Sequence, residues 1–175
     1  MLEGKTVNLR IVEKEDLPLL TEWQNTPEIS GKFMFRQQKS RAEAEKEYDK
    51  RPPDSKTFFI EKKDGAKIGW MGHFRNGGFL EIYYYLLPNE RRKGYGTEAI
   101  MIMVDYLFLS RDLTRIQATC DPDNIASNKV LEKTGFKKEG TIRKGGYNVG
   151  RIVDDCLYGI TREEWKGPKI LTRPT

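Results

Sequence analysis

The sequence predicts a mixed α+β (α/β) protein in which helices flank a central, mostly antiparallel sheet. The first reason is a run of β-hairpins between residues 57 and 87, where Asp64-Gly65 and Asn76-Gly77 are typical of two-residue turns. The second is a change of period, because apolar residues from Gly96 to Leu109 recur three and four positions apart, as on one face of a helix. Strands and helices in this order build a layered domain.

The elements of the N-terminal half follow from alternation, helix starts and proline stops. A strand is expected over residues 5–12, and the acidic pair Glu15-Asp16 begins a short helix that runs to about Trp23. Residues 24–38 are expected to form a loop. A polar helix over residues 40–50 follows and ends before Pro52-Pro53. The hairpin strands are expected at residues 57–62, 67–74 and 79–87.

A strand, a helix and two final strands complete the predicted chain. Asp123 or Asn124 caps the helix, and Gly135 ends it. The apolar face of this helix consists of Ile125, Val130 and Leu131. The last two strands are expected to join through Gly145-Gly146. The three strands lie at residues 114–120, 136–143 and 151–160, which gives the order βααβββαβαββ.

The composition is that of one folded domain. The 175 residues are 37% hydrophobic and 33% charged, and we expect a single domain over residues 1–175 with its core at about residues 5–165. With 8 Phe, 8 Tyr and 3 Trp, the chain has too many aromatic residues to be disordered. Apolar stretches such as residues 100–104 are far shorter than the ~20 residues that span a bilayer. Since no charged-then-apolar leader opens the sequence, we expect a cytoplasmic protein without a membrane partner.

Charge and the counts of cysteine and histidine exclude several functions. The net charge of +5 suits either an anionic cofactor or simply a well-solvated surface. The longest basic run, residues 91–93, is too short for a nucleic-acid arm, so no nucleic acid is expected. Cys120 and Cys156 cannot form a disulfide framework and are expected to be reduced. The single histidine, His73, excludes most zinc sites and histidine-based triads, so no metal is predicted.

The segment from Pro88 to Ala99 carries the chemistry. A strand ends, the cations of residues 91–93 follow, and Gly94 and Gly96 lead the chain into the next helix. Backbone N–H groups at a helix start are unpaired and partly positive, and glycine lets them approach a ligand closely. The pattern predicts a phosphate-binding cradle, with a plain tight turn as the alternative.

Two common phosphate motifs do not account for this segment. Gly94-x-Gly96-x-x-Ala99 has the form of the dinucleotide fingerprint, but six residues separate Leu87 from Gly94, where the fingerprint needs a strand that runs straight into the first glycine. Thr114 stands where the fingerprint needs an acid for the ribose. The Walker A motif fails because no Gly-Lys-Ser/Thr occurs in the segment.

Three motifs in order resemble those of the GNAT acyltransferase superfamily. The loop Arg91-x-x-Gly94-x-Gly96 resembles the family's Arg/Gln-x-x-Gly-x-Gly/Ala loop. A second stretch, Asn124-x-x-Ser127-x-x-Val130-Leu131-Glu132-Lys133-x-Gly135-Phe136, supports the same resemblance. A third, Glu139-Gly140 followed by Asp154, Tyr158 and Glu163-Glu164-Trp165, is similar to the branch of ribosomal-protein N-terminal (alanine/serine) acetyltransferases and polyamine acetyltransferases. The resemblance runs from about Lys5 to Trp165. It implies the GNAT fold and a direct transfer from acetyl-CoA to a primary amine in a ternary complex.

The resemblance also implies where acetyl-CoA binds. The diphosphate lies on the loop backbone from Arg92 to Thr97, and the pantetheine arm pairs with the strand end at residues 85–87 like an added strand. Asn124 and Ser127 contact the pantetheine or the sulfur. The implied cofactor-binding residues are Tyr85, Leu86, Leu87, Arg91, Arg92, Lys93, Gly94, Tyr95, Gly96, Thr97, Asn124 and Ser127.

Transfer of an acetyl group from a thioester to an amine requires an acid or hydrogen-bond donor for the leaving thiolate and a base for the attacking amine. Many family members have a tyrosine acid where this chain has Leu131, so Ser127 is the expected acid or hydrogen-bond donor to the thiolate. A serine that caps its own helix is the alternative. Glu81 is the expected base and would act through a water molecule; the alternative is that Glu81 is only a solvated or salt-bridged carboxylate. Asp154 is the second choice for the base.

The acceptor stays open between a protein N-terminal α-amine and a small amine or polyamine. Residues 24–38 and 151–158 are expected to shape its site, and the N–H of Leu86 or Leu87 is expected to stabilise the oxyanion. A catalytically silent CoA-binding or regulatory module is the alternative function. A homodimer is also left open.

Overall fold

The structure is a computed structural model that describes residues 1–171 of the chain. Its centre is an eight-stranded sheet in the order β1-β2-β3-β4-β5-β6-β8-β7. The strands are β1 (Leu2–Glu3), β2 (Val7–Ile11), β3 (Lys56–Lys62), β4 (Lys67–Asn76), β5 (Phe79–Leu86), β6 (Arg115–Cys120), β7 (Lys137–Asn148) and β8 (Arg151–Thr161). The helices are α1 (Leu17–Asn25), α2 (Pro27–Ser30), α3 (Arg41–Lys50), α4 (Tyr95–Ser110) and α5 (Ile125–Thr134), with 3-10 turns η1 (Lys14–Asp16) and η2 (Pro88–Glu90).

The sheet consists of two antiparallel halves joined by one short parallel contact. Neighbours from β1 to β5 are antiparallel, and so are β6 with β8 and β8 with β7. Between the halves, β5 and β6 run parallel and pair Leu80 with Ile116 and Glu81 with Gln117. The predicted fold, a mixed and mostly antiparallel sheet flanked by helices, is confirmed.

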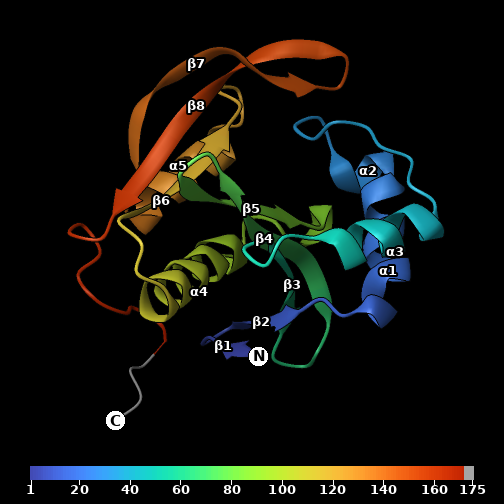
Figure 1. Cartoon of the computed structure of the whole chain (residues 1–175), viewed down its shortest axis with the longest axis horizontal. Helices are drawn as coiled ribbons and strands as arrows, with labels where there is room; N and C mark the ends of the chain where they lie inside the picture. Colours follow the sequence, from blue (N-terminus) through green and yellow to red (C-terminus); the bar gives the residue numbers. More distant parts are fainter. Residues whose placement is uncertain (172–175) are drawn as a thin grey trace.

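Helices cover both faces of the sheet, because successive strand residues point to opposite sides. Phe58 and Ile60 pack in a core with α4 and α5, whereas Phe59 between them packs with α1 on the other face. There Trp23 of α1 meets Phe59 edge-on, with 5.6 Å between ring centroids. Figure 1 shows α1, α2 and α3 grouped together on one side of the molecule, while the long hairpin of β7 and β8 arches over the top.

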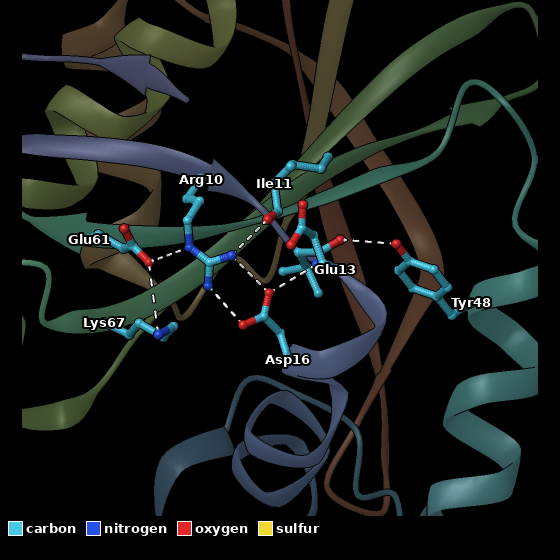
Figure 2. A network of polar contacts seen from close by, with 8 residues as sticks. Arg10, Ile11, Glu13, Asp16, Tyr48, Glu61 and Lys67 are labelled. Carbon is cyan, nitrogen blue, oxygen red and sulfur yellow. Dashed lines mark hydrogen bonds and ion pairs between the residues drawn. The ribbon is translucent and has the colours of Figure 1, made fainter.

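An ion-pair network fastens the layer of α1 to the sheet. Arg10 of β2 donates from both terminal nitrogens to Asp16, at 2.8 and 2.9 Å, and from Nε to Glu61 of β3 at 2.7 Å. Figure 2 shows the guanidinium between these two carboxylates. Asp16 also accepts the Glu13 N–H at 2.9 Å, immediately before α1 begins. The bidentate geometry fixes the direction in which the chain enters α1.

The β7–β8 hairpin differs from the sequence prediction. β7 continues through Gly145 and Gly146 instead of ending before them, and Gly146 pairs with Val153. The turn is at Val149-Gly150, where both residues have positive φ (45° and 79°), as a two-residue type I′ turn requires. A register shift between Ile142 and Gly146 interrupts the alternation of side chains along β7. The sequence pattern therefore does not show that the strand continues through these residues.

Smaller differences lie at the edges of predicted elements. The apolar face expected for α5 is wrong at Ile125, which is 57% exposed, because that residue opens the helix on its solvent side. The helix cap is Asn124, and Gly135 ends the helix with φ 103°, as predicted. The segment expected as a loop contains the short helix α2, and the two-residue strand β1 was not predicted.

His73 is a fully buried histidine on β4. Its Nδ1 lies 2.8 Å from the carbonyl oxygen of Asp54 and therefore carries the ring hydrogen, while Nε2 has no partner among residues 1–171. The ring lies near Phe58 and Tyr106, with centroids 6.4 and 6.3 Å away. Burial, chiefly, lowers the pKa of His73 to about 4, and the nearby Arg111 charge acts in the same direction.

We predict that His73 makes the fold sensitive to acid. Its folded pKa of about 4 lies below the ordinary value of 6.5, so between these pH values the unfolded chain binds the proton more tightly. Its contribution to stability is therefore present above pH 6.5 and falls as pH decreases toward 4, by on the order of 3 kcal/mol. Urea unfolding of wild type and His73→Phe across this range tests it. Wild type should lose more stability than the variant, and equal pH slopes would contradict the prediction.

Candidate active site

A large cleft opens where β5 and β6 separate. Their pairing ends with Glu81 and Gln117, although β5 continues to Leu86 and β6 to Cys120. The cleft has a volume of about 1240 Å³ and is lined by α1, residues 30–37, α3, β5, the loop before α4, β6, α5 and the end of β7. It therefore combines residues from both halves of the sheet.

The end of β5 presents one free main-chain N–H to this cleft. The Leu87 N–H donates to the Ile68 carbonyl oxygen at 2.9 Å, so it belongs to the β4–β5 ladder and is not available to an oxyanion. Antiparallel strands alternate the side to which their N–H and C=O groups point. Leu86 therefore turns its N–H away from β4, toward the gap that β6 leaves. Of the two predicted oxyanion donors, Leu86 alone keeps the required orientation.

The loop before α4 holds a row of unpaired backbone amides. Arg92 and Gly94 adopt left-handed conformations, with φ 63° and 86°, and α4 begins at Tyr95. Within residues 1–171, the amides of residues 92–97 donate to no protein acceptor, and the first helical bond runs from the Glu98 N–H to the Gly94 carbonyl. Left-handed turns that open a helix in this way form a concave anion site. Arg92, which is not glycine, is strained there, as is common in functional loops.

The three cations of the loop have different surroundings. Arg91 donates from Nε to the Leu86 carbonyl at 3.0 Å and from Nη2 to the Ile29 carbonyl at 3.4 Å, so it ties the loop to β5 and α2. Lys93 pairs with Glu90 at 3.0 Å. Within residues 1–171, Arg92 has no hydrogen-bond or ion-pair partner and is exposed. It is therefore the loop cation best placed for an anionic ligand.

Ser127 lies in the first turn of α5, on the wall of the cleft. Asn124 caps this helix by accepting the Ser127 N–H at 3.2 Å, so the alternative that Ser127 caps its own helix is wrong. The Ser127 hydroxyl lies 2.6 Å from the phenol oxygen of Tyr84 on β5. Leu131, one turn further along, is 1% exposed in the core and offers no polar group. Cys120 at the end of β6 also lines the cleft.

Glu81 lies on the opposite face of β5 from Tyr84. Its carboxylate is 5% exposed and accepts hydrogen bonds from Thr119 at 2.7 Å, Asn76 at 2.8 Å and Gln117 at 3.0 Å. It is thus neither solvated nor salt-bridged, although it lines the cleft. Three donors leave it one lone-pair site at Oε1 for a water molecule.

Asp155 is a cleft residue that the sequence analysis missed. It lines the cleft, and burial, followed by the charges of Asp121 and Glu81, raises its pKa above the ordinary value. Asp154, the second choice for the base, is exposed and accepts the Lys144 N–H at 2.9 Å, so it orders the irregular part of β7. Adjacent strand residues face opposite sides, so only one of the two can face the cleft, and no sequence pattern shows which one it is.

Residues 1–171 contain neither a membrane-spanning helix nor a cluster of metal-binding side chains. None of their helices combines the length and the apolar character needed to cross a membrane. No three or more His, Cys, Asp and Glu side chains gather there in a way that could hold a metal ion.

The family model "Acetyltransferase (GNAT) domain" matches residues 6–137 of this chain. The chain belongs to the GNAT acetyltransferase family. A relative in Bacillus licheniformis, the uncharacterized N-acetyltransferase p20, is 29% identical over 176 residues, which cover 95% of this chain and 98% of the relative. The enzyme class is accordingly N-acetyltransferase, as the sequence predicted.

Solved structures share the fold. The spermidine N-acetyltransferase of Vibrio cholerae, in complex with CoA and spermine, matches with a TM-score of 0.82 and 23% identity over 91% of this chain and 98% of that chain. RimL, a ribosomal L7/L12 α-N-protein acetyltransferase in complex with coenzyme A through a cysteine disulfide, matches with a TM-score of 0.80 and 19% identity over 91% and 97%. At these identities the likeness shows the fold alone.

We predict that Gly94→Val abolishes the binding of acetyl-CoA. A Cβ at Gly94 meets no protein atom within 4 Å, so the side chain would occupy the space in front of the amides, where a diphosphate would lie. Gly65→Val is the matched control, because Gly65 has nearly the same φ (85° against 86°), equally open surroundings and a place in a distant hairpin turn. Calorimetry should detect binding in the control and none in Gly94→Val. Equal affinities would remove the argument for the cradle.

Proposed function

We propose that the cleft transfers an acetyl group from acetyl-CoA directly to a primary amine in a ternary complex. The observation that carries this proposal is the row of unpaired amides at residues 92–97 beside the open edge of β5. The amides and Arg92 suit a diphosphate, and the edge of β5 that β6 leaves unpaired beyond Glu81 suits the amides of a pantetheine arm. Acetyl-CoA supplies an activated thioester when bound. We also propose that the whole chain forms one catalytic domain.

The sulfur of the cofactor is best accommodated near α5. Asn124 and Ser127 begin this helix, and the Cys120 thiol lines the cleft beside them. In RimL, coenzyme A is held by a cysteine disulfide, and Cys120 is the cysteine of this chain that faces the cleft. A sulfur in this region would lie close to the Ser127 hydroxyl, which suits Ser127 as hydrogen-bond donor to the leaving thiolate.

The base acts from the other face of β5. Glu81 can accept the amine proton through a water molecule at its remaining lone-pair site. Asp155 is the second candidate, because its raised pKa brings it nearer to the working pH of a base and, within residues 1–171, no donor is bonded to it. The Leu86 N–H stabilises the developing negative charge on the thioester oxygen.

The acceptor enters along the face that carries Glu81. Aromatic residues of β4 and β5 form its floor, where Trp70 stacks on Tyr85 with 4.9 Å between centroids. Of the two solved structures described above, one is named a spermidine N-acetyltransferase and the other a ribosomal-protein acetyltransferase. We propose that the acceptor of this chain is an amine of one of these two kinds. A cytoplasmic location and a homodimer stay predictions.

A catalytically silent CoA-binding or regulatory module is the second candidate. The observation that favours it is Leu131, buried in the core where many family members have a tyrosine acid. Such a module would bind coenzyme A tightly and release no thiol with any amine.

A free-thiol release assay tests the proposed function. Acetyl-CoA is offered with peptides that begin with Ala, Ser or Met, with polyamines and with aminoglycosides. We expect thiol release above the rate of hydrolysis with at least one peptide or polyamine, together with an acetylated product of the correct mass. Tight CoA binding without release in every mixture would contradict the enzyme and support the silent module.

We predict that Ser127→Ala and Glu81→Gln each lower kcat without unfolding the protein. Loss of a donor to the thiolate should reduce kcat by about 10-fold, and loss of the base by about 100-fold. Asp155→Asn is measured beside them, because it should become the slower variant if Asp155 is the base. Circular dichroism verifies folding. Wild-type rates in both Ser127→Ala and Glu81→Gln would refute these assignments.

A further inference from the structure

The Ser127 hydroxyl has a different partner from other helical hydroxyls in this protein. Ser30, Ser110 and Thr134 donate to the carbonyl oxygen four residues earlier, at 3.1, 2.6 and 3.0 Å. The Ser127 hydroxyl instead lies 2.6 Å from the Tyr84 phenol, across the gap between α5 and β5. Its own helix therefore does not determine where its hydrogen points.

The Tyr84 phenol is suited to act as a permanent donor. Burial raises the pKa of Tyr84 well above its usual value, so the phenol keeps its proton at every pH at which an enzyme works. Its ring packs against the core shared by α4 and α5, which holds the oxygen in place. When an acceptor in the cleft takes the Ser127 hydrogen, the short contact requires the phenol to donate to Ser127 Oγ.

A sulfur atom lies beside the start of α5, the helix that carries Ser127. The Cys120 thiol lines the same cleft as Ser127 and Tyr84. Burial, chiefly, raises the pKa of Cys120 to about 11, and the thiol donates to the Asp121 carbonyl oxygen at 3.5 Å and to the Asn124 carbonyl oxygen at 3.9 Å. This end of the cleft therefore already accommodates a sulfur atom next to the helix that carries Ser127.

We propose that Tyr84 is a positioning residue, which directs the Ser127 hydroxyl toward the sulfur that departs during acetyl transfer. The inference rests on the proposed function. As the amine nitrogen bonds to the acetyl carbon, the carbon–sulfur bond breaks, its electron pair goes to sulfur, and the amine proton goes to the base through water. Ser127 donates a hydrogen bond to the thiolate, and Tyr84 donates to Ser127 without losing its proton. Each bond in such a chain polarises the next.

A double-mutant cycle on the full chain tests this role. Wild type, Tyr84→Phe, Ser127→Ala and the double variant are assayed with acetyl-CoA and the best amine of the panel. Tyr84→Phe should lower kcat about tenfold, with the Kd for acetyl-CoA and the KM for the amine changed less than about twofold. In the Ser127→Ala background the same change should have no further effect on kcat, because the two hydroxyls act through one path.

Tyr158→Phe is the matched control for the loss of a buried phenol. Tyr158 is 1% exposed and donates to Asn128 at 2.8 Å, so it makes the same kind of bond to the neighbouring residue of α5 from the core behind the cleft. Its kcat should stay within about twofold of wild type. Equal losses of kcat in Tyr158→Phe and Tyr84→Phe would assign both to helix packing and overturn the proposal.

The remaining outcomes separate this inference from the proposed function. Wild-type kcat in Tyr84→Phe, multiplicative losses in the double variant, or a weaker Kd with unchanged kcat would each overturn the role of Tyr84 and leave the acetyltransferase standing. A wild-type chain that binds acetyl-CoA but releases no thiol with any amine would overturn the proposed function and this inference with it.

Discussion

The cleft depends on the shortness of the parallel contact between β5 and β6. Only at Leu80–Ile116 and Glu81–Gln117 are the two strands paired within the described residues, and beyond them the strands separate. Each strand is still held by an antiparallel neighbour, β4 on one side and β8 on the other. The opening is therefore made by the sheet itself. A longer parallel ladder would pair the main-chain groups of Leu86 and close the site.

The other wall depends on how α1 is attached. Arg10 joins β2, β3 and the residue before α1 through one guanidinium, and the apolar side of α1 then packs on Phe59 and Trp70. This places α1 and the segment that follows it over the face of β5 that carries Glu81. The proposed acceptor side is thus anchored independently of the proposed cofactor side, which α4 and α5 form. Such a division lets acceptor specificity change without disturbing the loop before α4.

Local rules in the sequence predicted much of the fold and the loop of the site. Glycine turns, the two hydrophobic periods and the position of Gly94 before α4 each depend on neighbouring residues alone. The contacts of the proposed site do not, because they join residues that lie far apart in the sequence. Tyr84 and Ser127 meet across 43 positions, and Asp155, not Asp154, faces the cleft because of the register of β8. The predicted turn at Gly145-Gly146 failed for the same reason, since a bulge is defined by its partner strand.

The alternation of β5 separates the two halves of the proposed chemistry. Tyr84 points toward α5 and the cofactor side, whereas Glu81 shares the opposite face with Tyr85 and the acceptor floor. A donor for the thiolate and a base for the amine therefore approach the reacting atoms from opposite sides of one strand. This arrangement keeps the proton acceptor away from the hydroxyl that has to remain a donor. It also explains why buried polar groups are tolerated there, because each has partners on its own face: Ser127 for Tyr84, and three neutral donors for Glu81.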